Sequence, residues 1–104
     1  MAQLDLYRNN NPRTKRTYPL LLDIQSDLFE DLGTRVVIPL SKATSIKKPL
    51  AQLMPVVLFE REKFVLITPQ LAGVPTKELG NAAGSLSEQR DVVLAAIDFL
   101  LTGF

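Results

Sequence analysis

The C-terminal segment, residues 85–104, constrains the fold most, because it carries a long helical pattern that the rest of the chain lacks. Its apolar residues recur at steps of three and four, which places them in one stripe along a helix. Ser85 and Glu88 have the spacing of a capping box, and Gly103 suits a helix end because glycine tolerates the left-handed conformation. The apolar positions are Val93, Leu94, Ile97, Leu100, Leu101 and Phe104.

Phe104 follows the predicted helix end, and the pattern leaves two interpretations open. In the first, the ring packs back into the core and pins the helix. In the second, Thr102, Gly103 and Phe104 form a recognition tip that meets a partner. Chain termini are usually poorly ordered unless something ties them down, so an apolar terminal residue needs one of these roles.

Short strands account for most of the remaining chain. Alternating or β-branched apolar runs predict strands at residues 4–7, 18–24, 34–40, 54–59 and 64–68. We interpret residues 60–63 as a hairpin turn, residues 41–50 as a mobile polar loop, and residues 80–84 as a flexible lead into the helix. The sequence therefore predicts one mainly β domain, residues 1–104, in which antiparallel strands are closed by one C-terminal helix.

The composition favours a protein that acts by binding. The 104 residues include no Cys and no His, which removes thiolate catalysis, the usual general base and most transition-metal sites. We therefore expect no cofactor and no metal site. Twelve basic and eleven acidic residues give a net charge of +1, which is too small for a general nucleic-acid binder. No apolar run is long enough to span a membrane and no signal-peptide pattern is present, so we expect a cytoplasmic protein.

Two sets of residues offer weak cases for catalysis. Arg35, Thr34 and Thr68 can be arranged as a histidine-free ribonuclease site, in which the arginine stabilises phosphorane charge. The competing interpretation is that Arg35 pairs with a carboxylate such as Asp23. Neighbouring carboxylates are the second set, although nothing in the sequence places them in a pocket. They are the pairs Asp23 and Asp27, and Glu30 and Asp31.

Exposed apolar and basic residues are the better candidates for binding. Leu28 and Phe29 are adjacent, so an extended segment cannot point both at one core, and we expect at least one to be exposed. Two segments are basic: the first is either a solvated loop or a contact for an anion or an acidic peptide, and the second belongs to the mobile loop at residues 41–50. Their cationic residues are Arg13, Lys15 and Arg16 in the first segment and Lys42, Lys47 and Lys48 in the second.

Five short segments, taken in order, resemble the CcdB toxin family. They are Asp-Ile-Gln-Ser-Asp at 23–27, Arg-Val-Val-Ile-Pro-Leu at 35–40, Pro-Val-Val at 55–57, Val-Pro at 74–75 and Ala-Ile-Asp-Phe at 96–99, before a terminal glycine and apolar residue. Each segment alone is weakly specific, but all five occur in order, and the resemblance runs from Leu4 to Phe104. The resemblance implies a small SH3-like antiparallel β-barrel of the CcdB–MazF type, with an accessory sheet and a C-terminal helix.

The same resemblance implies a function. Proteins of this family are homodimeric toxins of toxin–antitoxin modules. They are not enzymes: they bind DNA gyrase A and trap gyrase on cleaved DNA. A CcdA-like antitoxin neutralises the toxin with a disordered acidic tail, and toxin and antitoxin together repress their operon by binding its operator DNA. Two alternatives stay open, an endoribonuclease toxin of the MazF or Kid type on the same fold, and an inactive chromosomal relative.

The resemblance also implies binding residues. At Thr102 the family's best-known member carries a tryptophan that stacks on an arginine of gyrase A, and at Asp98 it carries an uncharged amide. The two basic segments are the candidate antitoxin contacts. The implied gyrase-binding residues are Leu28, Phe29, Asp98, Leu101, Thr102, Gly103 and Phe104.

Overall fold

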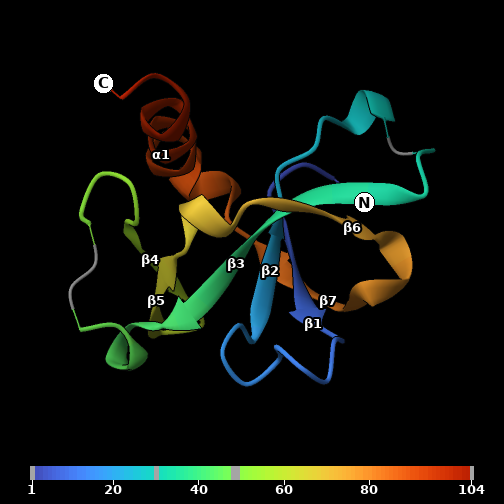
Figure 1. The fold of residues 1–104 in the computed structure, drawn as a ribbon, viewed down its shortest axis with the longest axis horizontal. Coiled ribbons are helices and arrows are strands. Elements are labelled where there is room, and N and C mark those ends of the chain that lie inside the picture. Colours follow the sequence, from blue (N-terminus) through green and yellow to red (C-terminus); the bar gives the residue numbers. More distant parts are fainter. Residues whose placement is uncertain (1, 30, 48–49, 104) are drawn as a thin grey trace.

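A curled antiparallel sheet makes up most of the structure (Figure 1). The computed structural model of the chain describes residues 2–29, 31–47 and 50–103. Within them, six strands follow the order β4-β5-β3-β2-β1-β7, and β6 pairs with β3 outside this path. The strands are β1 (Asp5–Asn9), β2 (Leu20–Asp23), β3 (Thr34–Lys42), β4 (Val56–Phe59), β5 (Glu62–Leu66), β6 (Ala72–Pro75) and β7 (Leu79–Ser85).

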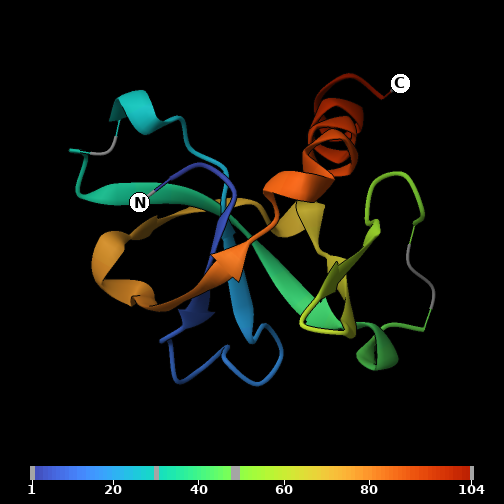
Figure 2. The same ribbon diagram turned by 180° about the vertical axis from the view of Figure 1, so that it is seen from behind.

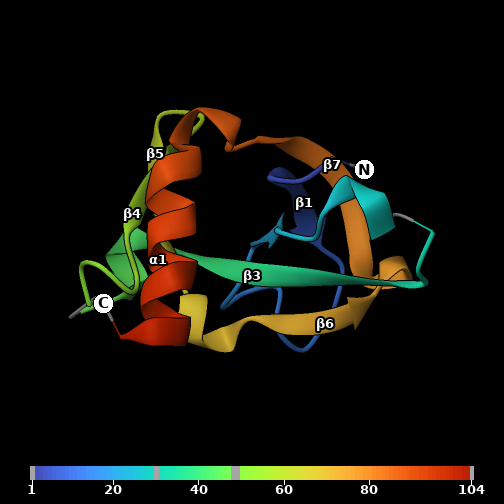
Figure 3. The ribbon, with the colours of Figure 1, turned by 90° about the horizontal axis from the view of Figure 1, so that it is seen from above.

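The long strand β3 joins the two parts of this sheet. Residues 34–37 pair with β6 and residues 40–42 pair with β5, while residues 37–40 pair with β2 on the opposite edge. The main curled sheet and the smaller β4–β5 extension confirm the predicted barrel-like fold. Viewed from above, α1 (Arg90–Thr102) lies beside β4 and β5 at one end of the molecule, and β1, β6 and β7 lie toward the other (Figure 3).

The core forms on one face of the sheet. Leu6, Leu22 and Ile38 are paired across β1, β2 and β3, so their side chains share a face, and all three are fully buried. Helix α1 covers this core with Val93 and Ala96, which lie on its buried side. Burial of each such aliphatic side chain contributes about 1.5–3 kcal/mol, so this face supplies much of the stability.

The helix begins later than the capping box predicts. Ser85 is the last residue of β7, and its Oγ accepts a hydrogen bond of 3.1 Å from the Ser87 N–H. The 3₁₀ turn η5 (Ser87–Gln89) follows, and α1 starts only at Arg90 (Figure 2). The predicted end is confirmed, because Gly103 is left-handed at φ 77° and its N–H donates to the Phe99 carbonyl at 2.8 Å. No helix in the described residues is both long and apolar enough to cross a membrane.

The expectation that residues 80–84 form a flexible linker is wrong. They belong to β7, which pairs antiparallel with β1. Gly80 and Gly84 are needed here because neighbouring atoms approach them closely, not because the segment is flexible. A Cβ at Gly80 would lie 2.8 Å from the Arg8 carbonyl oxygen, and a Cβ at Gly84 would lie 2.5 Å from Cε1 of Phe59. The strand therefore requires small residues where the backbone of β1 and the Phe59 ring press against it.

The first prediction tests whether β7 is a packed strand. Gly80→Ala should lower the free energy of unfolding by about 1–3 kcal/mol, because the rigid Arg8 carbonyl has to move. Gly73→Ala in β6 is the matched control, since its new Cβ meets no heavy atom within 4 Å. Chemical denaturation of both variants measures the difference, and equal midpoints would contradict the packing of β7.

Candidate functional site

Two adjacent apolar side chains project from the turn between β2 and β3. The turn contains the short 3₁₀ helix η1 (Asp27–Phe29), in which Leu28 is 88% exposed and Phe29 is 54% exposed. Leu32, just beyond, is also exposed. The expectation of at least one exposed side chain is confirmed for both residues. A group of exposed apolar side chains on one turn is a feature of binding surfaces. We call Leu28, Phe29 and Leu32 the η1 patch.

Local hydrogen bonds hold the backbone of this turn. The Phe29 N–H donates to the Ser26 carbonyl at 3.1 Å, and the Leu28 N–H donates to Ser26 Oγ at 3.2 Å. The side chain of Gln25 spans the turn, because its Nε2 donates to the Phe29 carbonyl at 2.8 Å and its Oε1 accepts from the Val36 N–H at 3.1 Å. The exposed side chains thus stand on an ordered backbone.

The N-terminal segment supports the turn from the other side. The Gln3 N–H donates to Asp27 Oδ1 at 2.6 Å, and Gln3 Nε2 donates to the Ile24 carbonyl at 3.0 Å. Gln3 Oε1 in turn accepts from Nη1 of Arg90, the first residue of α1, at 3.1 Å. A chain of polar contacts therefore links the η1 turn to the start of the helix.

A buried ion pair lies at the base of the turn. Arg35 on β3 and Asp23 on β2 are fully buried, with Nη2 and Nε of the arginine 2.6 and 2.9 Å from Asp23 Oδ2. The predicted pairing of Arg35 with Asp23 is confirmed. Asp23 Oδ1 accepts from the Gln25 N–H at 3.0 Å, and Arg35 Nη2 donates to the Gln25 carbonyl at 3.3 Å. A buried ion that loses its partner is costly, so the two side chains stay together. The pair therefore holds the end of β2 beside the start of β3, where the turn leaves the sheet.

The same burial disfavours the ribonuclease arrangement. Arg35 and Thr68 have no exposed surface, and Thr34, the neighbour of Arg35 on an extended strand, is exposed. Arg35 Nη1 and Thr68 Oγ1 are buried without a hydrogen-bond partner among the described residues, but neither faces solvent. A phosphodiester therefore has no path to the guanidinium in this conformation.

Acid–base chemistry has little support elsewhere. Tyr7 is buried, and desolvation first, then the negative charges of Asp5 and Asp23, raise its pKa above the ordinary value. Its hydroxyl accordingly stays protonated at neutral pH. Of the carboxylates considered above, Asp23 is bound to Arg35, Asp27 and Asp31 are exposed, and Glu30 lies outside the described residues. Residues 2–29, 31–47 and 50–103 contain no group of three or more potential metal ligands.

The end of α1 carries the second group of predicted binding residues. Leu101 is 75% exposed, and Asp98, Thr102 and Gly103 are also exposed. Thr102 Oγ1 donates to the Asp98 carbonyl at 2.8 Å, one turn earlier in the helix. Phe104 lies outside the described residues, so its two interpretations stay open.

The η1 patch and the end of α1 do not meet within one chain. In Figure 1 both lie on the upper side of the molecule, but η1 is at one end of the longest axis and the helix end is at the other. The view from above shows the same separation (Figure 3). One chain therefore presents two apolar patches on one side rather than one continuous surface.

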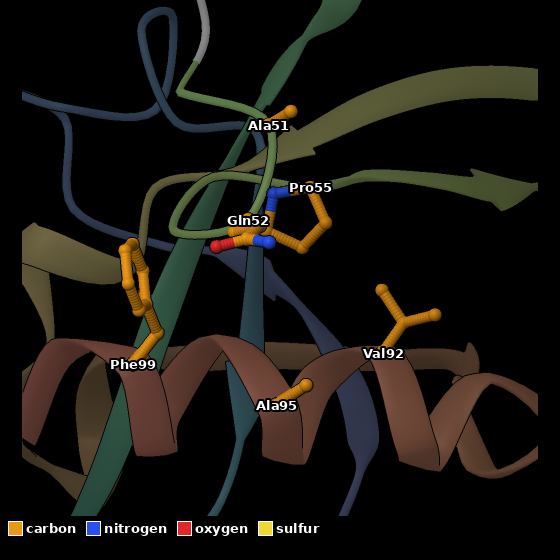
Figure 4. A pocket seen from close by; sticks show the side chains of 6 residues that line it. All are labelled: Ala51, Gln52, Pro55, Val92, Ala95 and Phe99. Carbon is orange, nitrogen blue, oxygen red and sulfur yellow. The ribbon is translucent and has the colours of Figure 1, made fainter. Parts of the chain in front are cut away.

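A groove lies between α1 and the segment before β4, and sequence patterns did not predict it. Its volume is about 300 Å³, and the segment before β4 forms its second wall (Figure 4). Val92 in its lining is an exposed apolar side chain, and three more lie on β4 and just before it, at Leu50, Val56 and Leu58. We call this surface the α1 groove. The residues that line it are Ala51, Gln52, Pro55, Val92, Ala95 and Phe99.

The basic segments lie on the opposite side from the two apolar patches. The loop between β1 and β2 and the end of β3 with η2 (Ala43–Ser45) are both at the lower edge in Figures 1 and 2. Lys42 lies 3.7 Å from Glu62, and the side chains of both are about half exposed. The other described cations of these segments, Arg13, Lys15, Arg16 and Lys47, are exposed, and Lys48 lies outside the described residues.

The family model described as CcdB protein matches residues 3–103, which is nearly the whole chain.

Proposed function

The chain belongs to the CcdB family of toxins from toxin–antitoxin modules, and we propose that it binds DNA gyrase A and traps gyrase on cleaved DNA. The observation that supports this proposal most directly is the η1 patch, in which Leu28 and Phe29 project from a turn tied to a buried ion pair. Apolar anchors on a rigid backbone are typical of binding hot spots, because little conformational freedom is lost when they dock.

Such a poison needs no catalytic group of its own. It has to bind the cleaved gyrase complex more tightly than the resealed one, and the difference in binding free energy then shifts gyrase toward the cleaved state. The absence of His and Cys from the chain and the burial of Arg35 are compatible with this mode of action.

We propose a gyrase surface made of the η1 patch and the helix end. Leu28 and Phe29 supply the first part; Asp98, Leu101, Thr102, Gly103 and Phe104 supply the second. Thr102 lacks the ring of the tryptophan expected from the family, and this forfeits a cation–π contact of about 1–2 kcal/mol. We therefore propose that Phe104 carries more of the contact in this protein.

A homodimer would present two copies of each of the two separated patches. We propose that two chains associate through the α1 groove, because Val92 in its lining is exposed and further exposed apolar side chains lie on β4 and just before it, at Leu50, Val56 and Leu58. A two-fold dimer repeats each patch in symmetric positions, which matches the two-fold symmetry of the gyrase A dimer.

The second prediction concerns this dimer. Light scattering at micromolar concentration should give the mass of two chains for the wild type and of one chain for Ala95→Glu, because a charge in the groove is left without a partner. Ala82→Glu, at an exposed position on β7, is the control and should stay dimeric. A monomeric wild type would contradict the proposal.

The third prediction tests gyrase poisoning. Purified gyrase, ATP, supercoiled plasmid and the toxin should yield linear DNA after detergent and protease treatment. Leu28→Ala and Phe29→Ala should each weaken this trapping about thirtyfold, since loss of an anchor often costs about 2 kcal/mol. Removal of residues 102–104 should abolish trapping without unfolding the protein, and Thr102→Trp should strengthen it.

Three outcomes of this assay separate the alternatives. A melting temperature that falls by several degrees in Phe104→Ala, with full trapping, would show that this residue pins the core instead. Cleavage of RNA in a parallel reaction without gyrase would support the endoribonuclease. The absence of both activities in the folded dimer would identify an inactive relative.

We also propose an antitoxin of the CcdA type with an acidic disordered segment. It would contact the two basic segments, which share one side of the molecule. The complex, and not the toxin alone, should then shift an operator fragment in a gel, because the net charge of +1 gives the toxin little attraction for DNA. The candidate contacts are Arg13, Lys15, Arg16, Lys42, Lys47 and Lys48.

The fourth prediction tests these contacts. Charge reversal in both basic segments should slow association with the antitoxin and reduce its salt dependence, because exposed charges act mainly on the encounter rate. Lys63→Glu and Lys77→Glu, at exposed positions outside these segments, are the controls. An association rate that is equal in the charge-reversed protein and the wild type would refute the assignment.

A further inference from the structure

The carboxamide of Gln25 joins the η1 turn to the sheet with two hydrogen bonds of opposite sense. Its Oε1 accepts from the Val36 N–H on β3 at 3.1 Å, and its Nε2 donates to the Phe29 carbonyl at 2.8 Å. An amide side chain is suited to this position because it carries a donor and an acceptor at one end. Gln25 therefore acts as a brace between the strand and the turn.

The backbone of Gln25 is itself fixed by the buried ion pair. Its N–H donates to Asp23 Oδ1 at 3.0 Å, and its carbonyl accepts from Arg35 Nη2 at 3.3 Å. Asp23 and Arg35 have no exposed surface, whereas the hydrogen bond to Phe29 lies at the surface. The buried ion pair therefore holds the backbone of Gln25 in place, and the side chain of Gln25 in turn holds the exposed η1 turn.

Hydrogen bonds, rather than apolar packing, hold the shape of the turn. Leu28 and Phe29 are exposed, and no residue of η1 is buried, so apolar packing contributes little to its order. Its backbone depends on hydrogen bonds, among them the Phe29 carbonyl, which accepts from both Gln25 Nε2 and the Leu32 N–H. Loss of the Gln25 bond should therefore loosen the turn more than the rest of the fold.

We propose that Gln25 is a positioning residue for target binding. It keeps Leu28 and Phe29 in the presented conformation, so that binding does not carry the entropic cost of ordering them. This inference rests on the proposed role of the η1 patch in binding gyrase A.

Gln25→Glu is the most informative variant. A carboxylate oxygen still accepts from the Val36 N–H, but an ionised carboxylate cannot donate to the Phe29 carbonyl. The toxin concentration needed for half-maximal gyrase trapping should rise about three- to tenfold, as expected for one net hydrogen bond. Gln25→Met removes both bonds at similar volume and should give an equal or larger loss. Gln70→Glu, an exposed glutamine on η3 (Thr68–Gln70), is the matched control.

Amide hydrogen exchange in the free protein provides a readout that does not involve gyrase. In Gln25→Glu the amides of Phe29 and Leu32 should exchange faster than in the wild type, because both take part in hydrogen bonds of the turn. The amides of Leu22 and Ile38 in the core report global stability, and their protection should be unchanged. The ratio of turn to core exchange isolates the local effect even if the variant is somewhat less stable.

The combined results distinguish two failures. If Leu28→Ala weakens trapping but Gln25→Glu does not, the proposed surface stands and the positioning role of Gln25 is refuted, whatever the exchange rates show. If neither Leu28→Ala nor Phe29→Ala affects trapping, the proposed surface fails and the inference fails with it. Faster exchange of the Phe29 amide and weaker gyrase trapping, both in Gln25→Glu, would support the proposed surface and the positioning role of Gln25.

Discussion

The buried ion pair between Arg35 and Asp23 is the interaction on which the presentation of the η1 patch depends. Both side chains are fully buried, and removing one partner of such a pair costs about 3–5 kcal/mol because the other is left uncompensated. The pair also binds the Gln25 backbone through both its N–H and its carbonyl. The pair therefore holds β2 and β3 together at the point where the exposed turn begins. Gln3 in turn connects that turn to the first residue of α1, because its N–H donates to Asp27 and its side chain accepts from Arg90.

The apolar and the basic surfaces lie on different sides of the molecule. Apolar side chains are presented on one side of the sheet, at η1 and at the end of α1, and basic loops lie on the other. An apolar partner and an acidic disordered one would therefore meet different sides of the toxin. The α1 groove is a third surface, and association through it would double each of the others.

Patterns in the sequence predicted the structural features that depend on residues close together in the chain. Residues 34–40 are rich in β-branched side chains and form a strand, Gly103 ends the helix in the left-handed conformation, and adjacent Leu28 and Phe29 are exposed. Strand β7 was missed because its Gly- and Ala-rich sequence has no apolar alternation; it is a strand because β1 and Phe59 approach it closely. The α1 groove was missed because it forms between a loop and a helix far apart in sequence. The brace by Gln25 depends on a turn geometry that no spacing encodes.

Contact between the η1 patch and gyrase A is tested most directly by site-specific photocrosslinking. A photoreactive phenylalanine analogue placed at Leu28 should capture gyrase A when toxin, gyrase and DNA are irradiated together, and the same analogue at Leu101 should do so as well. Placed at Thr44, an exposed position on the basic side, it should capture none. Capture from Thr44, or a lack of capture from Leu28 while gyrase is still trapped on cleaved DNA, would contradict the proposed surface.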